Sequence, residues 1–300
     1  MSAIAAGSRT ILKNVLFATD LSECSNKALP YALSVARRHG AMTHAAYVVA
    51  PESEMFYTHP PDWAIVDRED EQWIQRYVTT LENQLQEVPH RVTVPRGNIC
   101  NALAQIIKDR AIDLLVVGTH GRTGVRRLVM GSVAENLIRR AQCPVLSIGP
   151  NVSGTPERAA KFARILVPTD FSQESLSALP QAISFADEDE AQLMLLHVVS
   201  EPAVGIVDLE STTSFLLRRL RDLLPSEADF WCHTECLVEF GRQFASPAER
   251  ILEVAQRRAS DLIVLGVRPL RGDLGLVTHL SSTTAQIITQ AACPVLTVRG

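Results

Sequence analysis

The chain has 300 residues, of which 46% are hydrophobic and 21% charged, and its formal net charge at pH 7 is −4. This composition supplies enough apolar area for folded cores and excludes a disordered chain, and the mild acidity disfavours nucleic acid as a partner. No run approaches the roughly 20 apolar residues of a membrane-spanning helix, and the first ten residues lack the apolar core of a signal peptide. We therefore expect a cytoplasmic protein that makes no contact with a membrane.

The first half of the chain alternates short apolar runs with helical patterns, which is typical of a parallel sheet covered by helices on both faces. The apolar runs predict strands at residues 14–18, 43–49, 91–94, 114–117 and 145–148. Apolar residues at 3.6-residue spacing predict three helices between them. The residues of these stripes are Ala28, Leu29, Ala32, Leu33 and Ala36; Ile74, Tyr77, Leu81, Leu85 and Val88; and Ala134, Leu137, Ile138 and Ala141.

The second half shows the same alternation. Strands are predicted at residues 164–167, 192–199, 235–240, 262–265 and 295–298. The helical stripes are Leu176, Leu179, Ile183 and Ala186; Leu216, Leu220 and Leu223; and Thr284, Ile287, Ile288 and Ala291. Residues 151–160 follow neither period and predict a linker, which places one domain at residues 1–150 and the other at 161–300.

Short segments of the first half recur 150 positions later, so the chain is an internal repeat of two domains. Asp20 in Ala-Thr-Asp returns as Asp170 in Pro-Thr-Asp, and Cys-Pro-Val-Leu starts at both Cys143 and Cys293. Each copy predicts an α/β domain, a doubly wound, five-stranded parallel sheet flanked by helices. Such sheets bind ligands beyond the carboxyl ends of their strands, so the loops after the first and fourth strands should be neighbours.

A glycine-rich segment follows the fourth predicted strand of the first domain. Gly118, Gly121 and Gly131 have no Cβ, so backbone N–H groups can approach an anion closely there. Ser132 opens a helix whose first unpaired N–H groups and positive dipole end favour phosphate. The segment therefore predicts a binding site for a phosphate chain.

The frame Gly-x2-Gly-x9-Gly-Ser over residues 118–132, together with the repeated Thr-Asp and Cys-Pro-Val-Leu segments, resembles the universal stress protein (UspA) family. The resemblance covers almost the whole chain and indicates two such domains in tandem. It implies an adenine-nucleotide α-hydrolase-like fold with strands in the order 3-2-1-4-5 in each domain. It also implies that the first domain binds ATP, with or without Mg²⁺.

The nucleotide-binding positions of the family transfer to matching residues of the first domain. The resemblance implies that Asp20 accepts a hydrogen bond from a ribose hydroxyl and that backbone groups of Val48 meet the adenine edge. It also implies that backbone N–H groups and the Ser132 hydroxyl surround the phosphates. The implied binding residues are Ala18, Thr19, Asp20, Val48, Val117, Gly118, His120, Gly121, Gly131, Ser132, Val133 and Ala134.

The second domain departs from this pattern where the phosphates should lie. Pro269, which lacks an N–H, stands at the expected second glycine, and Ser281-Ser282 is in register with Gly131-Ser132. Asp170, Val198 and Ser282 are retained and could hold an adenosine moiety weakly. The sequence thus predicts one competent nucleotide site and one degenerate site.

Some residues have a second interpretation. Asp20 could be a helix N-cap or a turn residue. His120 could be a general acid or base, although an anion-facing or structural role is favoured for it because no obvious nucleophile or second carboxylate accompanies it. The Cys232-His233 pair and Cys236 could ligate a metal, but burial is favoured because no second cluster follows at zinc spacing. Arginines in the glycine-rich segment add charge to the site or form a solvated surface; they are Arg122, Arg126 and Arg127. Residues 55–63 are rich in aromatics and predict a lid, an interface or packing over the sheet edge.

The residues leave three functional classes open. The first is a nucleotide-dependent stress-response or signalling module, in which ATP favours one conformation that selects a protein partner. The second is a slow ATPase or autokinase-like phosphotransferase that uses the same site. The third is a scaffold that needs no nucleotide. The resemblance further implies that the last strands pair between subunits, so the two halves could form an internal pseudo-dimer, and further self-association stays open.

Overall fold

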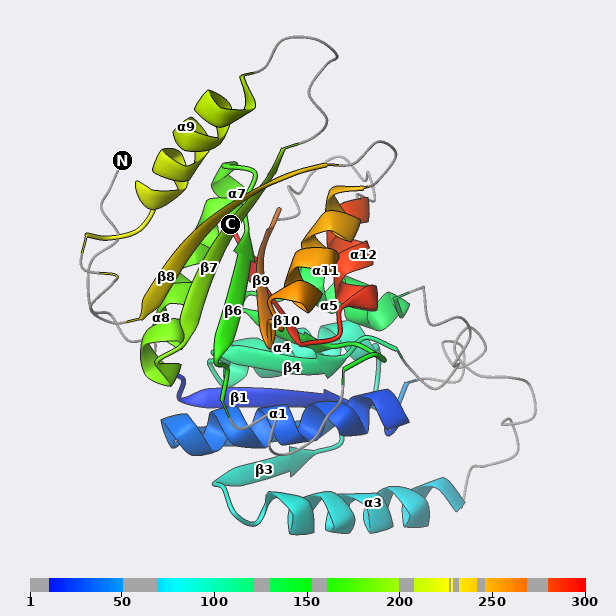
Figure 1. Ribbon diagram of the computed structural model, residues 1–300. Coiled ribbons are helices and arrows are strands. Elements are labelled where there is room, and N and C mark those ends of the chain that lie inside the picture. The colour runs from blue at the N-terminus through cyan, green and yellow to red at the C-terminus, as the bar shows by residue number, and fades with distance from the viewer. Residues whose placement is uncertain are drawn as a thin grey trace. The chain divides into compact units, whose positions relative to one another are not determined.

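The structure, a computed structural model, describes residues 11–50, 69–120, 130–152, 161–199, 208–226, 228, 232–241, 246–268 and 280–300. The chain divides into two compact units, Ile11–Ala160 and Lys161–Gly300, which we call the N-terminal and the C-terminal domain. Each contains parallel strands flanked by helices (Figure 1). The predicted α/β fold class is therefore confirmed.

The strands of the N-terminal domain are all parallel and pair in the order β3-β2-β1-β4-β5. In chain order the elements are β1 (Asn14–Thr19), α1 (Glu23–His39), β2 (Met42–Tyr47), α3 (Glu69–Leu85), β3 (His90–Thr93), α4 (Ile99–Asp109), β4 (Leu114–Gly118), α5 (Ser132–Arg140) and β5 (Val145–Ile148). Each predicted strand of this half is found, with ends at most two residues from those predicted. The direction of strand order reverses between β1 and β4, so their carboxyl ends flank the position where doubly wound sheets bind ligands.

The strands of the C-terminal domain are likewise parallel and pair in the order β8-β7-β6-β9-β10. The elements are β6 (Arg164–Pro168), α7 (Gln173–Ser177), α8 (Leu179–Asp189), β7 (Gln192–Val199), α9 (Leu209–Arg221), β8 (His233–Phe240), α11 (Pro247–Arg257), β9 (Leu262–Val267), α12 (Ser282–Gln290) and β10 (Val295–Arg299). The single helix predicted through Leu176 and Leu179 is wrong. The chain forms two helices there, and Pro180, which lacks an N–H, lies in the first turn of the second.

The central strands of both domains are apolar along their length because both of their faces are covered. Val15, Leu16 and Phe17 on β1 are fully buried, as are Ile165 and Leu166 on β6. A strand buried on both faces has a continuous apolar run where a half-exposed strand would alternate, which is why the sequence pattern located these strands well. In the described part of the chain, no helix combines the length and the apolar character needed to cross a membrane.

An aspartate at the amino end of the fourth strand fixes it to the first strand in each domain. The carboxylate of Asp113 accepts hydrogen bonds from the backbone N–H groups of Lys13 and Asn14, at 2.7 and 2.9 Å. Asp261 makes the equivalent pair of bonds in the C-terminal domain, both at 2.9 Å. These bonds help set the strand register that aligns the opposite, carboxyl ends of the two strands.

Two helices, α4 and α11, were not among those predicted. The deeply buried residues of α4 are only Leu103 and Ile107, so its apolar stripe is short. In contrast, α11 carries a local signal that could have been used. Ser246 accepts from the N–H of Glu249 at 3.2 Å, and the Glu249 carboxylate accepts from the N–H of Ser246 at 3.1 Å, which is a capping box.

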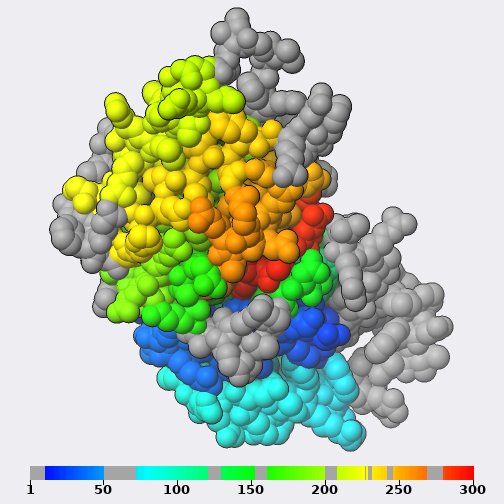
Figure 2. Space-filling view, in the orientation of Figure 1, coloured from blue at the N-terminus to red at the C-terminus, as the bar shows by residue number. Residues whose placement is uncertain are grey.

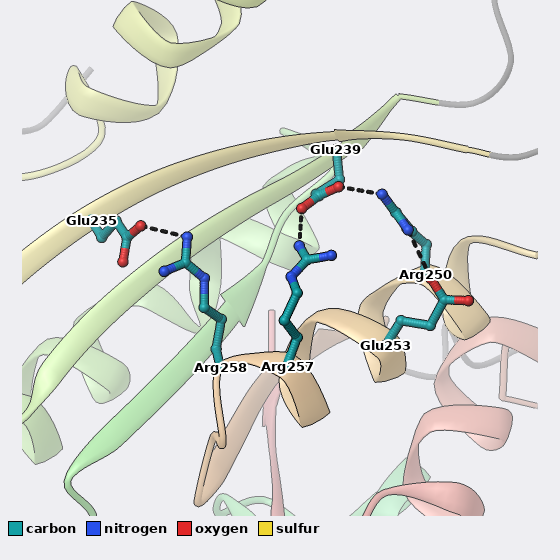
Figure 3. Close-up of polar contacts among 6 residues, drawn as sticks. All are labelled: Glu235, Glu239, Arg250, Glu253, Arg257 and Arg258. Atoms are coloured by element: carbon teal, nitrogen blue, oxygen red, sulfur yellow. Dashed lines mark hydrogen bonds and ion pairs between the residues drawn. The ribbon is translucent and has the colours of Figure 1, made fainter.

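Ion pairs fasten β8 to the region of α11 in the C-terminal domain (Figure 3). Glu239 on β8 lies between Arg250, at 2.5 Å, and Arg257. The side chains of Glu239 and Arg250 are only 17% and 14% exposed, so solvent screens this pair less than a surface ion pair. Two further pairs, Glu235 with Arg258 and Glu253 with Arg250, are both 2.7 Å long. We attribute a structural role to this cluster.

Candidate functional site

The first and fourth strands of the N-terminal domain carry predicted site residues at their adjoining carboxyl ends. Ala18 on β1 pairs with Val117 on β4, and Asp20 lies in the turn directly after β1. The hydroxyl of Ser22 links the two segments by donating a hydrogen bond to the carbonyl oxygen of His120, at 3.3 Å. The prediction that these two loops are neighbours is confirmed.

Side chains of the turn after β1 hydrogen-bond to the backbone of the same turn. Oγ1 of Thr19 accepts from the N–H of Leu21, and Oδ1 of Asp20 accepts from the N–H of Ser22, both at 3.0 Å. Ser22 is the N-cap residue of α1, because its hydroxyl oxygen accepts from the N–H of Ser25 at 3.2 Å. The cap role considered for Asp20 therefore belongs to Ser22, and the Asp20 carboxylate shapes the turn that precedes the helix.

Val48 directly follows β2 and is buried. The preceding residue, Tyr47, pairs with Thr19 in the strand register, so the end of β2 lies beside the turn after β1. The Tyr47 ring contacts Trp73 edge to face at 6.3 Å between centroids, and Trp73 stacks on Tyr77 at 6.2 Å. Trp73 is 44% exposed on α3, which is drawn in cyan in Figure 2. Sequence analysis missed this aromatic cluster, because spacing within α3 does not reveal a contact with the end of a strand.

A hydrogen bond joins the two described ends of the glycine-rich segment. The N–H of Gly131 donates to the carbonyl oxygen of Thr119 at 2.9 Å, and the N–H of Thr119 donates to Ile148 on β5 at 3.0 Å. Because Thr119 directly follows β4, this hydrogen bond holds the start of α5 beside the carboxyl end of β4. Other predicted residues lie outside the described residues, namely Gly121, Arg122, Arg126, Arg127 and the aromatic residues 55–63.

Among the described residues, no side chain caps the first turn of α5. Gly131 is its N-cap residue, with φ −63° and ψ 142°, and has no side-chain acceptor for the N–H groups that follow. Ser132, Val133 and Ala134 are the first helical residues, so their N–H groups have no partner within the helix. The positive end of the helix dipole lies at the same place. This turn is therefore chemically suited to an anion.

Gly118 lies against the backbone of α1. A Cβ built on Gly118 would lie 2.9 Å from the backbone nitrogen of Ser25 and 3.0 Å from the carbonyl carbon of Cys24. The backbone of α1 thus lies against the end of β4 at a distance that only glycine allows. From the sequence, all three glycines were predicted to allow the close approach of an anion. The structure shows that the packing of α1 is sufficient to explain glycine at position 118.

His120 is hydrogen-bonded to its neighbour and is half-buried. Its Nδ1 lies 2.9 Å from Oγ1 of Thr119, and its buried Nε2 has no hydrogen-bond partner among the described residues. Burial lowers the pKa of His120 below its usual value, which favours the neutral ring at pH 7. Its described hydrogen bond is to a hydroxyl and not to a carboxylate of the kind that orients a catalytic base. The geometry therefore suits a residue that faces a ligand or supports the loop.

We expect His120→Gln to make the stability of the N-terminal domain less dependent on pH. Because the folded-state pKa is depressed, the unfolded chain takes up this proton first as the pH falls below about 6.5. The wild type should therefore lose stability through this window, and glutamine, which does not titrate, should lose less. Thermal midpoints measured between pH 5 and 7.5 test this. His44, whose pKa is also lowered chiefly by burial, is kept in both proteins. Identical pH profiles would contradict the expectation.

The corresponding helix of the C-terminal domain has a side-chain cap. Ser281 is the N-cap residue of α12, and its hydroxyl oxygen accepts from the N–H of Thr284 at 3.1 Å. Its backbone, with φ −56° and ψ 145°, is close to that of Gly131. The two turns therefore share a conformation and differ in whether the N-cap side chain accepts from one of the first N–H groups. Pro269 lies outside the described residues.

In the turn after β6, the aspartate accepts two hydrogen bonds from the same serine. Oδ1 of Asp170 accepts both from the N–H of Ser172, at 3.0 Å, and from the Ser172 hydroxyl, at 2.5 Å. Burial alone would raise the pKa of Asp170, but these hydrogen bonds hold it below its usual value. The ring of Phe171 lies 4.6 Å from that of His197 and 3.9 Å from the guanidinium carbon of Arg219.

The two cysteines considered as metal ligands differ in burial. Cys232 is buried, and its thiol donates to the carbonyl oxygen of Ala228 at 3.7 Å. Cys236 is half-buried on β8. A group of three or more histidine, cysteine, aspartate or glutamate side chains able to hold a metal ion is not found among the described residues.

Comparison with known proteins agrees with the repeat in this chain. The profile of the universal stress protein family matches residues 12–148 and again residues 161–299. The chain is 25% identical over 320 residues to the universal stress protein Rv1996 of Mycobacterium tuberculosis, a match that covers 95% of this chain and 94% of that protein. It is 27% identical over 150 residues to the universal stress protein MJ0531 of Methanocaldococcus jannaschii, which covers 49% of this chain and 88% of that one.

A solved structure shares the fold over nearly the full length. The crystal structure of a universal stress protein from Archaeoglobus fulgidus aligns with a TM-score of 0.69 at 20% identity, covering 95% of this chain and 98% of that one. Two copies of the repeat, two matches to one family profile and a full-length structural likeness agree. The chain therefore belongs to the universal stress protein family and carries two of its domains in tandem.

Proposed function

We propose that the N-terminal domain binds one ATP molecule at the adjoining carboxyl ends of β1 and β4, and that the protein is a nucleotide-dependent stress-response or signalling module. The proposed site is formed by Ala18, Thr19, Asp20, Val48, Val117, Gly118, His120, Gly121, Gly131, Ser132, Val133 and Ala134. In this assignment Asp20 accepts from the ribose, the backbone of Val48 meets the adenine edge, and the first turn of α5 holds the phosphates.

One observation carries the proposal, namely that no described side chain caps the start of α5, whereas Ser281 caps the start of α12. Gly131 and Ser281 adopt nearly the same backbone angles, so glycine is not required at position 131 by backbone conformation. A helix start with uncapped N–H groups is a cost to stability that a bound anion would offset. The adjacent hydrogen bond from Gly131 to Thr119 holds this turn beside His120, next to the turn that carries Asp20.

The C-terminal domain is proposed to bind nucleotide weakly or not at all. Ser281 already occupies an N–H group at the start of α12, and both donors of Ser172 are bound to Asp170. Asp170, Val198 and Ser282 would still be present for an adenosine moiety. The tandem would then have one domain that responds to nucleotide and one that does not.

A nucleotide-dependent module works only if ATP has different affinities for two conformations of the protein, one of which selects the partner. In this proposal the partner is a protein. The cytoplasmic location and the pairing of the two halves through their last strands stay predictions from the sequence.

Titration calorimetry of the full chain with ATP tests the proposal. We expect saturable binding of about one ATP per chain, and the nucleotide carried through purification should have the mass of an adenine nucleotide. Mg²⁺ is included in one titration and chelated in another. If the wild type released phosphate from ATP and Asp20→Ala did not, the result would support the slow ATPase instead. The proposal would be refuted if the purified protein carried no nucleotide and millimolar ATP did not change its thermal midpoint. The nucleotide-independent scaffold would then be the remaining function.

A further inference from the structure

The turns after β1 and β6 share three hydrogen bonds, so a difference between the two turns is informative. In both, the threonine hydroxyl accepts from the N–H two residues later at 3.0 Å, and the aspartate accepts from the serine N–H at 3.0 Å. In both, the serine caps the following helix at 3.2 Å. Leu21 and Phe171 even share a positive φ, 68° and 63°.

The two turns differ in where the proton of the capping serine goes. Ser172 donates its hydroxyl proton to Asp170 in the same turn, at 2.5 Å. Ser22 donates its hydroxyl proton to the carbonyl oxygen of His120 in the other segment of the site, at 3.3 Å. A serine hydroxyl has one proton, so it cannot serve both acceptors at once.

The acceptor of Ser22 lies at the start of the glycine-rich segment. His120 immediately follows Thr119, whose carbonyl oxygen receives the N–H of Gly131 at 2.9 Å. Ser22 therefore connects the turn that carries Asp20 with the residues that set the position of the α5 start. In the C-terminal domain the carbonyl oxygen corresponding to that of Thr119 belongs to Val267, and it accepts from Gly300 at 3.1 Å because the pairing of β9 with β10 continues to Val267.

We infer that Ser22 is a positioning residue of the nucleotide site, whose hydroxyl fixes the phosphate-binding turn relative to the ribose-binding turn. The inference rests on the proposed function. Ser22 acts through the His120 carbonyl and the Thr119–Gly131 hydrogen bond, and it need not touch the ligand. It also keeps its own proton off the Asp20 carboxylate, which is to accept from the ribose. Ser172 has the same residue type and the same cap geometry but lacks this link.

The test uses Ser22→Ala in the full chain, with Ser172→Ala as the matched control and Ser22→Thr as the conservative variant. Both alanine variants lose an N-cap of the same geometry, so both should lower the thermal midpoint of their domain to a similar extent. Only Ser22→Ala should weaken ATP binding, by about fivefold, which corresponds to one neutral hydrogen bond. Ser22→Thr keeps the hydroxyl and should restore the affinity.

Two readouts distinguish positioning from a structural role. The affinity for adenosine, measured by competition, should change little in Ser22→Ala. Adenosine has no phosphate, so its binding does not depend on the position of the phosphate-binding turn. Without nucleotide, amide exchange of the Gly131 N–H should be faster in Ser22→Ala and unchanged in Ser172→Ala.

Several outcomes would overturn the inference. These are an equal loss of ATP affinity in both alanine variants, an equal loss for adenosine and ATP, and unchanged exchange at Gly131. A wild type that binds no ATP would refute the proposed function, and in that case exchange at Gly131 still decides whether Ser22 holds the turn.

Discussion

Replacing Gly131 with serine should weaken ATP binding tenfold or more while leaving the N-terminal domain at least as stable as before. The substitution gives α5 the N-cap residue that α12 has, in a backbone conformation that Ser281 already adopts. The new hydroxyl would accept from the N–H of Ala134, just as Ser281 accepts from Thr284. One of the donors proposed for phosphate would then be occupied.

The size of the effect follows from the kind of hydrogen bond that is lost. A backbone N–H that donates to an ionised phosphate oxygen contributes about 1.5–3 kcal/mol, so losing one such bond costs roughly ten- to a hundredfold in Kd. Serine in place of glycine at an N-cap gains a few tenths of a kcal/mol in stability. Binding and stability should therefore change in opposite directions, which misfolding cannot produce.

The measurements are ATP titration calorimetry and thermal unfolding without nucleotide. The matched control is Ser281→Gly, which removes the cap of α12. We expect a small loss of stability in the C-terminal domain and an unchanged number of ATP molecules per chain. Gly131→Val, which adds bulk without a hydroxyl, should also weaken binding strongly. ATP affinity that is the same in wild type and Gly131→Ser would refute the proposed phosphate site.

The sequence predicted the sheets well because their strands are buried on both faces. A run such as 114–117 needs no information beyond its own apolar residues, and β4 differs from that prediction only by the added Gly118. The sequence was less informative where neighbours decide the structure. The stripe through Leu176 and Leu179 did not reveal a break at Ala178, and α4 buries too few residues for a clear period.

In the candidate site, too, features set by the local sequence were predictable and features set by neighbouring elements were not. The residue types and spacing identified Asp20, Gly131 and Ser132, because a carboxylate after a strand and a glycine before a helix have direct chemical meanings. The role of Ser22 was not predictable, since Ser172 stands in an almost identical local sequence and directs its proton elsewhere. The packing reason for Gly118 depends on how closely α1 approaches β4, which spacing along the chain does not encode.

Gly266, the counterpart of Gly118, should tolerate substitution even less. A Cβ built on Gly266 would overlap the carbonyl oxygen of Glu174 and lie 2.5 Å from its carbonyl carbon and 2.7 Å from Cα of Ser175. All three atoms belong to the backbone of α7, so no side chain can rotate away to make room. We expect Gly266→Ala to lower the free energy of unfolding of the C-terminal domain by about 3 kcal/mol or more.

The two domains allow this prediction to be tested within one chain. Tandem domains can unfold in separate transitions, and ATP should raise the midpoint of the N-terminal one only, which assigns the transitions. Gly266→Ala should lower the other transition. Gly300→Ala is the milder control, because its Cβ would lie 3.0 Å from the Ser177 hydroxyl oxygen and 3.1 Å from Cα of Glu174, contacts that a small shift relieves.

Gly118→Ala provides the graded comparison, since its closest backbone contact would be 2.9 Å and a small shift of α1 could relieve it. Its cost should be about 1–2 kcal/mol, confined to the N-terminal domain. If Gly266→Ala left both transitions unchanged, α7 could not lie against β9 as closely as described. The contact between Arg268 and Glu174, 3.2 Å apart in the same region, would then also be in question.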